Sequence, residues 1–553
     1  MVQKIFRFIR REVANLHAAA YIVAFLTLFA QILALVRDRV FAHTFGVGEV
    51  LDLYYAAFRI PDILFALFAS LVSAYILIPL LADAKDALKT KQLLSETVSF
   101  FVLVLGVVSG ILFFFVGDIL EMLYPTLSGG DRFSEFVLLT QILLLQPILL
   151  GLSSILGSIT QIQRRFFLFA LSPVLYNVGI IIGVIFFEPI MGLPGLAWGV
   201  VLGAILHLSL HIPIVLQTKV FPRFTIPRKE TVGQVVGHSL PRSLALSANT
   251  LMEAGAIILI APIAVGAVTV FSFANNLQHI PLALIGASYA VVAFPTLARL
   301  HAEKQLDTFL ERVATAARHL IVWSMFAVVI FIVLRAHLVR VVLGSGEFTW
   351  DDTRLTAAVL ALLMLALVGQ ALILLIARAY YAGGKSFVPL YIQAFGALSS
   401  LGAAILFLWV YATFPAVQYF FEALLRISYV PHTEVVAAAL GIALGQILAG
   451  TLAIILFTRT YPGFWREIAP VMRESFAAAI VAGAVAYGAL LLLGGIFALT
   501  SLVAVLAQGI LAGTLGLVVF VGVLTLLANR EVAEMRAGID QIRAKRLEPQ
   551  SEF

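Results

Sequence analysis

The sequence predicts an all-α polytopic membrane protein with about 14 transmembrane helices. Three observations support this: the composition, the number of long apolar stretches, and the distribution of Lys and Arg between the loops. The 553 residues are 62% apolar and 12% charged, whereas a soluble domain is about 45–50% apolar and about 25% charged. A soluble fold of this length needs a polar surface that this composition cannot supply.

Fourteen stretches are long and apolar enough to cross a bilayer, which takes about 20 residues per helix. Five prolines at positions 61, 79, 147, 281 and 295 lie inside these stretches or near their ends and should kink them. The predicted spans are 18–41, 52–82, 94–116, 135–160, 168–187, 193–216, 238–262, 266–297, 313–334, 355–380, 387–411, 434–457, 475–496 and 500–528.

The basic residues predict the orientation of these spans. With the N-terminus inside, 26 of the 36 Lys and Arg residues fall on the inner side, counting Arg378 at the inner end of 355–380, and 5 fall in segments on the outer side. Cytoplasmic loops of membrane proteins carry such an excess of Lys and Arg. Both termini are therefore expected to be cytoplasmic.

The chain divides into five predicted regions. They are a basic amphipathic segment (1–17), an N-lobe of helices 1–6 (18–220), a C-lobe of helices 7–12 (221–460), helices 13 and 14 (461–528), and a cytoplasmic tail (529–553). The two lobes are inferred from an internal echo, in which an Ile-Pro pair is followed by Ala/Ser-Tyr and a second proline in helices 2 and 8. Parallel repeats of six helices are a known transporter plan.

Charged residues gather in the first two predicted helices, where a charge is costly and usually faces a cavity or a partner. We expect Arg37 and Arg59 to bind an anionic substrate, because a guanidinium holds a phosphate through two hydrogen bonds. The alternative is that the charges neutralise one another and join the two helices. Asp52 opens helix 2, so it is either a substrate-binding residue or an N-cap. Helix pairing is the preferred interpretation for three others: Asp38, Arg39 and Asp62.

Glu253 lies deep in helix 7 and is a candidate for coupling transport to Na⁺, H⁺ or the membrane potential. The alternative is a buried pairing with amide side chains of helix 8. Asn276 lies in that helix.

Several classes of function are excluded. There are no cysteines, which rules out disulfides and thiol catalysis. The sequence has no phosphate-binding GxxxxGK[ST] loop, no HExxH motif and no Cys/His spacing typical of a metal site. The basic residues sit in short loops, not in a nucleic-acid-binding patch. We therefore expect a transporter, not an enzyme, with no cofactor and no metal.

Four stretches resemble the MurJ/MviN flippase family and occur in the family's order. The first runs from Leu35-Val36-Arg37-Asp38-Arg39 through Phe45-Gly46-Val47-Gly48 and Leu51-Asp52 to Ala57-Phe58-Arg59-Ile60-Pro61-Asp62. The others are Arg165-Phe166 with Ala170, Pro173 and Asn177; Gly346-Glu347-Phe348-Thr349 with Asp352-Thr353; and Arg378-Ala379-Tyr380-Tyr381-Ala382 with Pro389. The number of predicted spans is also similar to that of the family.

The resemblance implies the fold of the multidrug/oligosaccharidyl-lipid/polysaccharide exporters, with two six-helix lobes around a central cavity and a lipid-tail groove formed by helices 13 and 14. It implies transport of lipid II, an undecaprenyl-pyrophosphate-linked disaccharide-peptide, across the bacterial cytoplasmic (inner) membrane, by alternating access and for cell-wall synthesis. Arg37, Asp52, Arg59 and Asn276 would be substrate-binding. Membrane lipids and cell-wall synthesis proteins are the implied partners.

This chain departs from the family pattern at several positions. Arginines usual in the family are replaced by Gln31, Phe65, Ala66 and Asn276, and the acidic residue linked to sodium falls on Ala256. Three other functions therefore remain open: a flippase for another polyprenyl-linked oligosaccharide, a drug or cation antiporter of the same fold, and a scaffold of cell-wall synthesis without transport.

Overall fold

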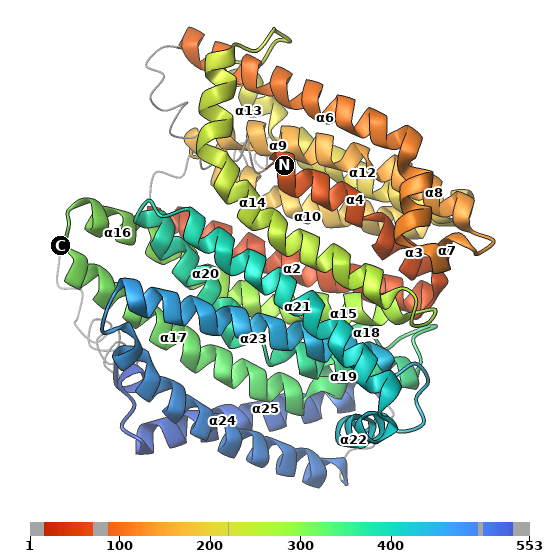
Figure 1. The fold of residues 1–553 in the computed structure, drawn as a ribbon, viewed down its shortest axis with the longest axis vertical. Coiled ribbons are helices and arrows are strands. Elements are labelled where there is room, and N and C mark those ends of the chain that lie inside the picture. The colour runs from red at the N-terminus through yellow and green to blue at the C-terminus, as the bar shows by residue number, and fades with distance from the viewer. Residues whose placement is uncertain (1–15, 70–86, 219, 496–500, 535–553) are drawn as a thin grey trace, which may run out of the picture. The chain divides into compact units, whose positions relative to one another are not determined.

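The computed structural model describes residues 16–69, 87–218, 220–495 and 501–534, and every regular element in these ranges is a helix. By their internal contacts the residues form two compact units. The first comprises residues 1–273 and 342–352, and the second comprises residues 274–341 and 353–553. Figure 1 shows the course of the chain.

The first unit contains the helices that carry the predicted charged residues. In order they are α2 (Leu16–Phe45), α3 (Glu49–Ala57), α4 (Arg59–Leu64), the π-helix η1 (Phe65–Ala69), α6 (Ala87–Leu123), α7 (Pro125–Ser128), α8 (Phe133–Leu143), α9 (Leu145–Ile162), α10 (Phe166–Ile182), η2 (Gly183–Phe187), α11 (Glu188–Met191), α12 (Leu193–Ser209), α13 (Ile212–Gln217), α14 (Lys229–Ile260) and the start of α15 (Ala267–Pro281).

The second unit begins within α15 and contains the C-terminal helices. In order they are η3 (Leu282–Ala287), α16 (Ser288–Ala302), α17 (Leu306–Val333), α18 (Arg335–Leu343), α19 (Trp350–Met364), α20 (Leu367–Ala382), α21 (Phe387–Thr413), α22 (Pro415–Leu425), α23 (Glu434–Thr460), α24 (Phe464–Gly494) and α25 (Leu502–Leu526).

The prediction of an all-α membrane protein is confirmed, but the count of fourteen spans is not. Eleven helices of the described residues are long and apolar enough to cross a membrane. The count rises to twelve if α19 and α20, which meet at a bend of 46°, form one broken span. Of the two remaining expected spans, α2 covers 18–41, and 52–82 continues into residues outside the described ranges.

Side chains on several of these helices are apolar and yet exposed, which is the arrangement that lipid stabilises. In the most apolar 18-residue stretch of each of α6, α21 and α25, only 22% of the residues are buried. Phe114 on α6 is 81% exposed and Leu398 on α21 is 73% exposed. Contiguous exposed apolar surface of this kind marks contact with a membrane.

Helices α3 and α15 end near two of the predicted prolines, Pro61 and Pro281, whereas α16 continues through Pro295. Pro61 has no N–H to donate to the carbonyl oxygen of Ala57, and α3 ends at Ala57. A π-helix follows at Phe65, and η3 begins directly after Pro281. The sequence repeat between predicted helices 2 and 8 is therefore accompanied by a similar backbone feature, because a π-helix follows the Ile-Pro pair in each. Pro79 and the amphipathic segment 1–17, apart from its last two residues, lie outside the described residues.

Close helix pairs are built on small residues in both units. A Cβ on Gly179 of α10 would overlap the backbone of Gly203 of α12, and a Cβ on Gly183, the first residue of η2, would overlap that of Gly199. The four-residue spacing on each helix places both glycines on one face, as in the small-xxx-small packing of membrane helices. In the second unit, a Cβ on Gly441 or Gly445 of α23 would overlap the backbone of α21.

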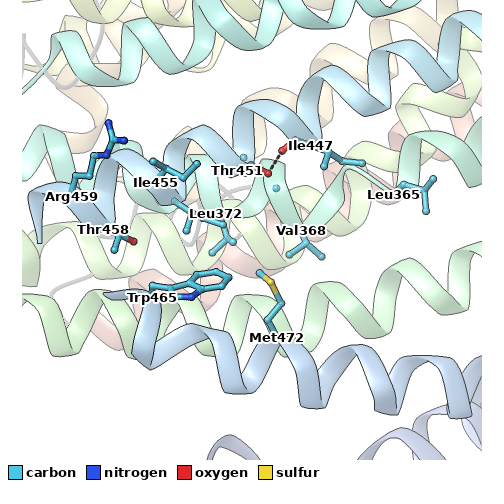
Figure 2. Close-up of a pocket in the computed structure, with 13 residues that line it drawn as sticks. Leu365, Val368, Leu372, Ile447, Thr451, Ile455, Thr458, Arg459, Trp465 and Met472 are labelled. Atoms are coloured by element: carbon cyan, nitrogen blue, oxygen red, sulfur yellow. Dashed lines mark hydrogen bonds between the residues drawn. The ribbon is translucent and has the colours of Figure 1, made fainter. Parts of the chain in front are cut away.

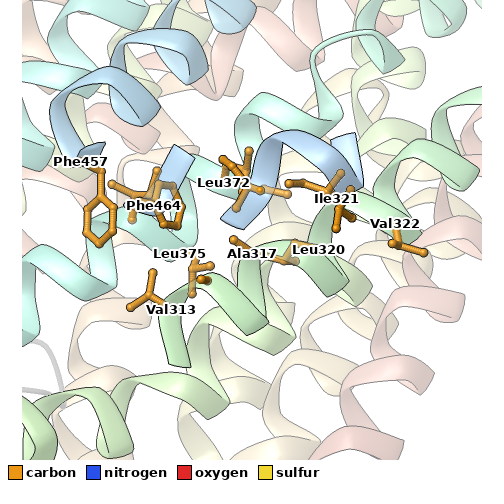
Figure 3. Close-up of a cluster of buried hydrophobic side chains, with 14 of the residues drawn as sticks. Val313, Ala317, Leu320, Ile321, Val322, Leu372, Leu375, Phe457 and Phe464 are labelled. Atoms are coloured by element: carbon orange, nitrogen blue, oxygen red, sulfur yellow. The ribbon is translucent and has the colours of Figure 1, made fainter. Parts of the chain in front are cut away.

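The core of the second unit lies where α17, α20, α23 and α24 pack together. Leu320 and Ile321 of α17, Leu375 of α20, and Phe457 of α23 are completely buried there (Figure 3). Phe464 of α24 packs edge-to-face on Phe457 with 4.7 Å between the ring centroids. Burial of these side chains fixes the start of α24 against the rest of the unit.

A buried cluster of charges also ties the C-terminal helices to α17. Arg318 of α17 is hydrogen-bonded to Glu531, a fully buried residue that follows α25. The Arg318 Nη1 also lies 2.8 Å from Glu467 Oε2 of α24. Nearby, Asn529 donates a hydrogen bond of 2.6 Å to Glu474 of α24. The sequence shows Arg318 as a charge within a span but does not indicate its partners.

Candidate functional site

The candidate site is built on α2, α3 and α4, which carry all six charged residues predicted for helices 1 and 2. The break after Ala57 separates Asp52 on α3 from Arg59 on α4. The two were expected to share a face because they are seven residues apart. Phe58, between the two helices, has helical backbone angles (φ −69°, ψ −22°), so the shared face stays a prediction. The two side chains have different partners.

Arg37 near the end of α2 is paired and bridged to a neighbouring helix. Its Nε and Nη2 donate to Asp38 Oδ1 at 3.0 and 2.8 Å, and its Nη1 donates to Asn177 Oδ1 of α10 at 3.2 Å. Asn177 is oriented by a hydrogen bond from its Nδ2 to the Pro173 carbonyl oxygen. The Arg37 side chain is 19% exposed, whereas that of Asp38 is 4% exposed. Asp38 therefore neutralises Arg37 from within the same helix.

Arg59 lies between two carboxylates. Its Nη1 is 3.5 Å from Glu253 Oε2 of α14, and its Nη2 is 3.8 Å from Asp62 Oδ2, one turn along α4. Its Nε donates to the Tyr55 carbonyl oxygen at 3.1 Å. Both ion pairs are longer than the 2.7–2.9 Å typical of a strong charge-assisted hydrogen bond. Arg59 thus has two loosely held carboxylate partners, one of them the predicted coupling residue.

Asp52 is the most completely engaged of these residues. It is 1% exposed, and its carboxylate accepts hydrogen bonds from the Gly266 N–H at 2.5 Å and the Thr269 N–H at 2.7 Å. The Thr269 hydroxyl adds a third at 2.6 Å. These donors belong to the first turn of α15 and the residue before it, where N–H groups have no partner within the helix. Asp52 therefore caps α15, a role close to the capping alternative considered for its own helix.

Arg39 and the turn after α2 contact a segment from much later in the chain. The Arg39 Nη1 donates to the Val342 carbonyl oxygen at 3.3 Å, and the Glu347 N–H donates to the His43 carbonyl oxygen at 3.1 Å. Gly346 has a positive φ of 57°, and a Cβ there would overlap His43. The Gly-Glu-Phe-Thr motif thus packs on the end of α2, and only glycine fits its first position.

Asn276 lies on the part of α15 that belongs to the second unit and is half-buried. Its predicted contribution to the substrate site stays a prediction. The positions without the usual family arginines are also defined: Gln31 is half-buried on α2, and Phe65 and Ala66 open η1. Ala256 is completely buried on α14, one turn from Glu253.

Three partners in this site were not predicted as functional residues. Asn177 belongs to one of the stretches that resemble the family, and no feature of the sequence marks Gly266 or Thr269 as functional. Each contributes through a neutral amide, hydroxyl or backbone group, which a search for intramembrane charge does not detect. No group of three or more His, Asp or Glu suited to a metal ion occurs within the described ranges.

The arrangement suits reversible binding of an anion. Arg37 is paired with one carboxylate, Asp38, and Arg59 with two, Asp62 and Glu253. An incoming phosphate can replace a carboxylate beside a guanidinium, and the displaced carboxylate then needs another cation or a proton to balance its charge in the membrane.

Comparison with solved structures supports the fold. A structure of the lipid II flippase MurJ in an inward closed conformation superposes with a TM-score of 0.71 over 92% of this chain and 99% of that chain, at 20% sequence identity. An inward-facing multidrug resistance transporter of the MATE family superposes with a TM-score of 0.59 over 82% of this chain and 99% of that chain, at 16% identity.

Sequence comparison extends this likeness. The lipid II flippase MurJ of Burkholderia cenocepacia is 26% identical over 385 residues, covering 66% of this chain and 73% of that protein. The probable lipid II flippase MurJ of Vibrio cholerae is 25% identical over 408 residues, covering 70% and 77%. The family model described as lipid II flippase MurJ matches residues 41–510, which include Arg59, Glu253 and all of the described α15. This chain therefore belongs to the MurJ family.

Proposed function

We propose that this protein is a flippase that moves lipid II across the bacterial cytoplasmic membrane by alternating access and so supplies cell-wall synthesis. The observation that supports this most directly is the family match over residues 41–510, which spans most of the membrane helices. Matched relatives are named lipid II flippases. The protein is a transporter, and its partners are lipid II and the membrane lipids around it.

Arg59 is the residue we assign to the diphosphate of the substrate. At rest it is neutralised by Glu253 and Asp62 at 3.5 and 3.8 Å. Because neither contact is short, a diphosphate with bidentate geometry can compete for the guanidinium. Glu253 then loses its cationic partner, and its negative charge can be balanced by Na⁺ or H⁺. This exchange links substrate binding to the predicted coupling residue.

Arg37 is assigned a second contact with the anionic head group. Its guanidinium is still partly exposed, although Asp38 and Asn177 hold it in place. Asp52 acts differently in this proposal, since its carboxylate is occupied by the first turn of α15. It supports the site by fixing α3 against α15, and Asn276 farther along that helix is a further substrate contact.

Rescue of a cell depleted of its own lipid II flippase tests this function. The wild-type chain should restore growth and the exposure of lipid II on the outer face of the membrane. Arg59→Ala should abolish both while the protein still accumulates in the membrane, and Arg59→Lys should rescue only partly, because an ammonium lacks the bidentate geometry. Arg473→Ala, an exposed arginine on α24, is the matched control and should rescue fully.

Two results would change the assignment. Growth without lipid II exposure, or exposure of a different polyprenyl-linked glycan, would identify another substrate of the same superfamily. If Arg59→Ala lowered the amount of folded protein and Arg59→Ala/Glu253→Ala restored both the amount and full transport, Arg59 would be a structural link between α4 and α14.

A further inference from the structure

An apolar pocket of about 590 Å³ lies within the second unit. It is lined by residues of α20, α23 and α24 together with Leu365 at the bend before α20 (Figure 2). Its volume falls in the range of about 300–1,000 Å³ that is typical of small-molecule sites. No residue of α25 is among the described residues that line it, so it differs from the groove implied between helices 13 and 14.

The backbone explains why this space exists. Gly369 of α20 and Gly450 of α23 touch, because a Cβ on Gly450 would lie 2.6 Å from the Gly369 Cα. The span is also broken just before this contact, where α19 and α20 meet at 46°. Close approach at one point combined with a bend leaves space alongside, and Trp465 and Met472 of α24 also line it.

The lining of the pocket is apolar along most of its length and polar at one end. Most of it is aliphatic, including Leu372, Ile455 and Met472, whereas Arg459 in the last turn of α23 is the single charged residue among the described residues of the lining. Trp465 and Thr458 lie near that end (Figure 2). The Thr458 hydroxyl is buried and has no hydrogen-bond partner within the described residues. Arg and Trp together are typical of the level of lipid head groups.

We propose that this pocket binds one acyl chain of an anionic phospholipid, with the phosphate of the head group against Arg459. The aliphatic walls accept the chain, and the Thr458 hydroxyl can donate to an ester oxygen at the start of that chain. The single cation at the mouth favours a head group of net negative charge. The pocket volume suits one acyl chain, whereas the much longer polyprenyl chain of the transported substrate would extend beyond it.

A photoactivatable phosphatidylglycerol with a diazirine on one acyl chain tests this site in the full chain reconstituted in phosphatidylcholine nanodiscs. Cross-links should map to 365–372 and 447–472. Ile455→Trp fills the pocket and should remove most of this cross-linking. Ile405→Trp, which adds the same ring at an exposed position of α21, should leave it unchanged. Equal labelling of the two variants would overturn the proposal.

The head-group assignment has its own test. Arg459→Gln should reduce the preference for phosphatidylglycerol over phosphatidylcholine about fivefold, since one basic residue near an anionic surface contributes about that much. Arg473→Gln on α24 lies outside the pocket and should leave the preference as it is. An unchanged preference in Arg459→Gln would overturn the assignment of the phosphate to Arg459.

Competition separates this site from the transport path. Unlabelled phosphatidylglycerol should displace the probe, whereas undecaprenyl phosphate should not. Displacement by undecaprenyl phosphate alone would assign the pocket to the substrate's tail and contradict the proposal. Thermal unfolding of each variant checks that the fold is intact, and because cross-linking is measured without transport, its result is independent of the proposed function.

Discussion

At the scale of single residues, Arg59 connects the predicted substrate site to the predicted coupling residue. Glu253 was predicted as a coupling residue in helix 7, and its carboxylate lies 3.5 Å from Arg59 Nη1 within the first unit. Asn249 holds the same carboxylate through a hydrogen bond of 3.3 Å. A carboxylate that alternates between Arg59 and a cation is a direct way to couple ion and substrate binding.

Glu253→Gln should therefore alter the dependence of transport on sodium, protons or membrane potential more than it alters stability. An ion pair that is partly exposed contributes about 0.2–1 kcal/mol, so thermal unfolding should change little. Transport into proteoliposomes, measured with each gradient imposed separately, checks this. The control is Glu230→Gln, an exposed carboxylate in the first turn of the same helix. Unchanged dependence on all three gradients would remove Glu253 from the mechanism.

Asp52→Asn should destabilise the protein, because an amide cannot accept all three hydrogen bonds from Gly266 and Thr269 with the strength of a carboxylate. The expected loss is about 1–3 kcal/mol, seen as a lower midpoint of thermal unfolding. Glu49→Gln, at the start of the same helix, is the control. If Asp52→Asn unfolded like the wild type and lost only substrate binding, Asp52 would be a ligand of the substrate and not a cap.

At the scale of helices, proline and glycine decide where the chain breaks and where it packs closely. Pro61 ends α3 at Ala57, which separates Asp52 from Arg59. Glycines at matching positions of α10 and α12 let their backbones touch. The predicted kinks followed from the chemistry of proline alone, whereas the partners of the glycines could be identified only once the helices were packed.

Arg318 is the main electrostatic link between α17 and the C-terminal helices, so Arg318→Met should strongly destabilise the second unit. Removal of the guanidinium leaves Glu531, which is fully buried, without a cation. A buried charge without its partner costs about 3–5 kcal/mol. Arg312→Met, an exposed arginine on the same helix, is the control for thermal unfolding. The double variant Arg318→Met/Glu531→Leu should recover most of the loss, and failure to recover would contradict the ion pair as the cause.

At the scale of the whole molecule, the distribution of Lys and Arg predicts the orientation of every span. Because the chain has no cysteine, a single introduced cysteine can be labelled selectively. A membrane-impermeant maleimide should label Thr126→Cys, in the predicted outer segment after α6, in intact spheroplasts. It should label Ser551→Cys in the tail only after the membrane is opened. Labelling of both positions in intact spheroplasts would contradict a cytoplasmic C-terminus.

The sequence by itself determined the fold class, most of the membrane-crossing segments and the family. These properties depend on local chemistry: a helix in lipid satisfies its own backbone groups, so an apolar run of sufficient length predicts a span without knowledge of its neighbours. The charged set from Arg37 to Asp62 was visible for the same reason, since a charge in a span is conspicuous wherever it lies.

Only the tertiary structure decided which partners these charges have. Asp52 binds Thr269, which is 217 residues away in the chain, and Arg318 meets Glu531 across 213 residues. Arg59 likewise pairs with Glu253 of another helix. Such pairs depend on which helix faces pack together. A small residue in the sequence indicates that close packing is possible, but it does not identify the helix that packs against it. The sequence therefore shows that a charge needs a partner, and the folded chain determines which residue provides it.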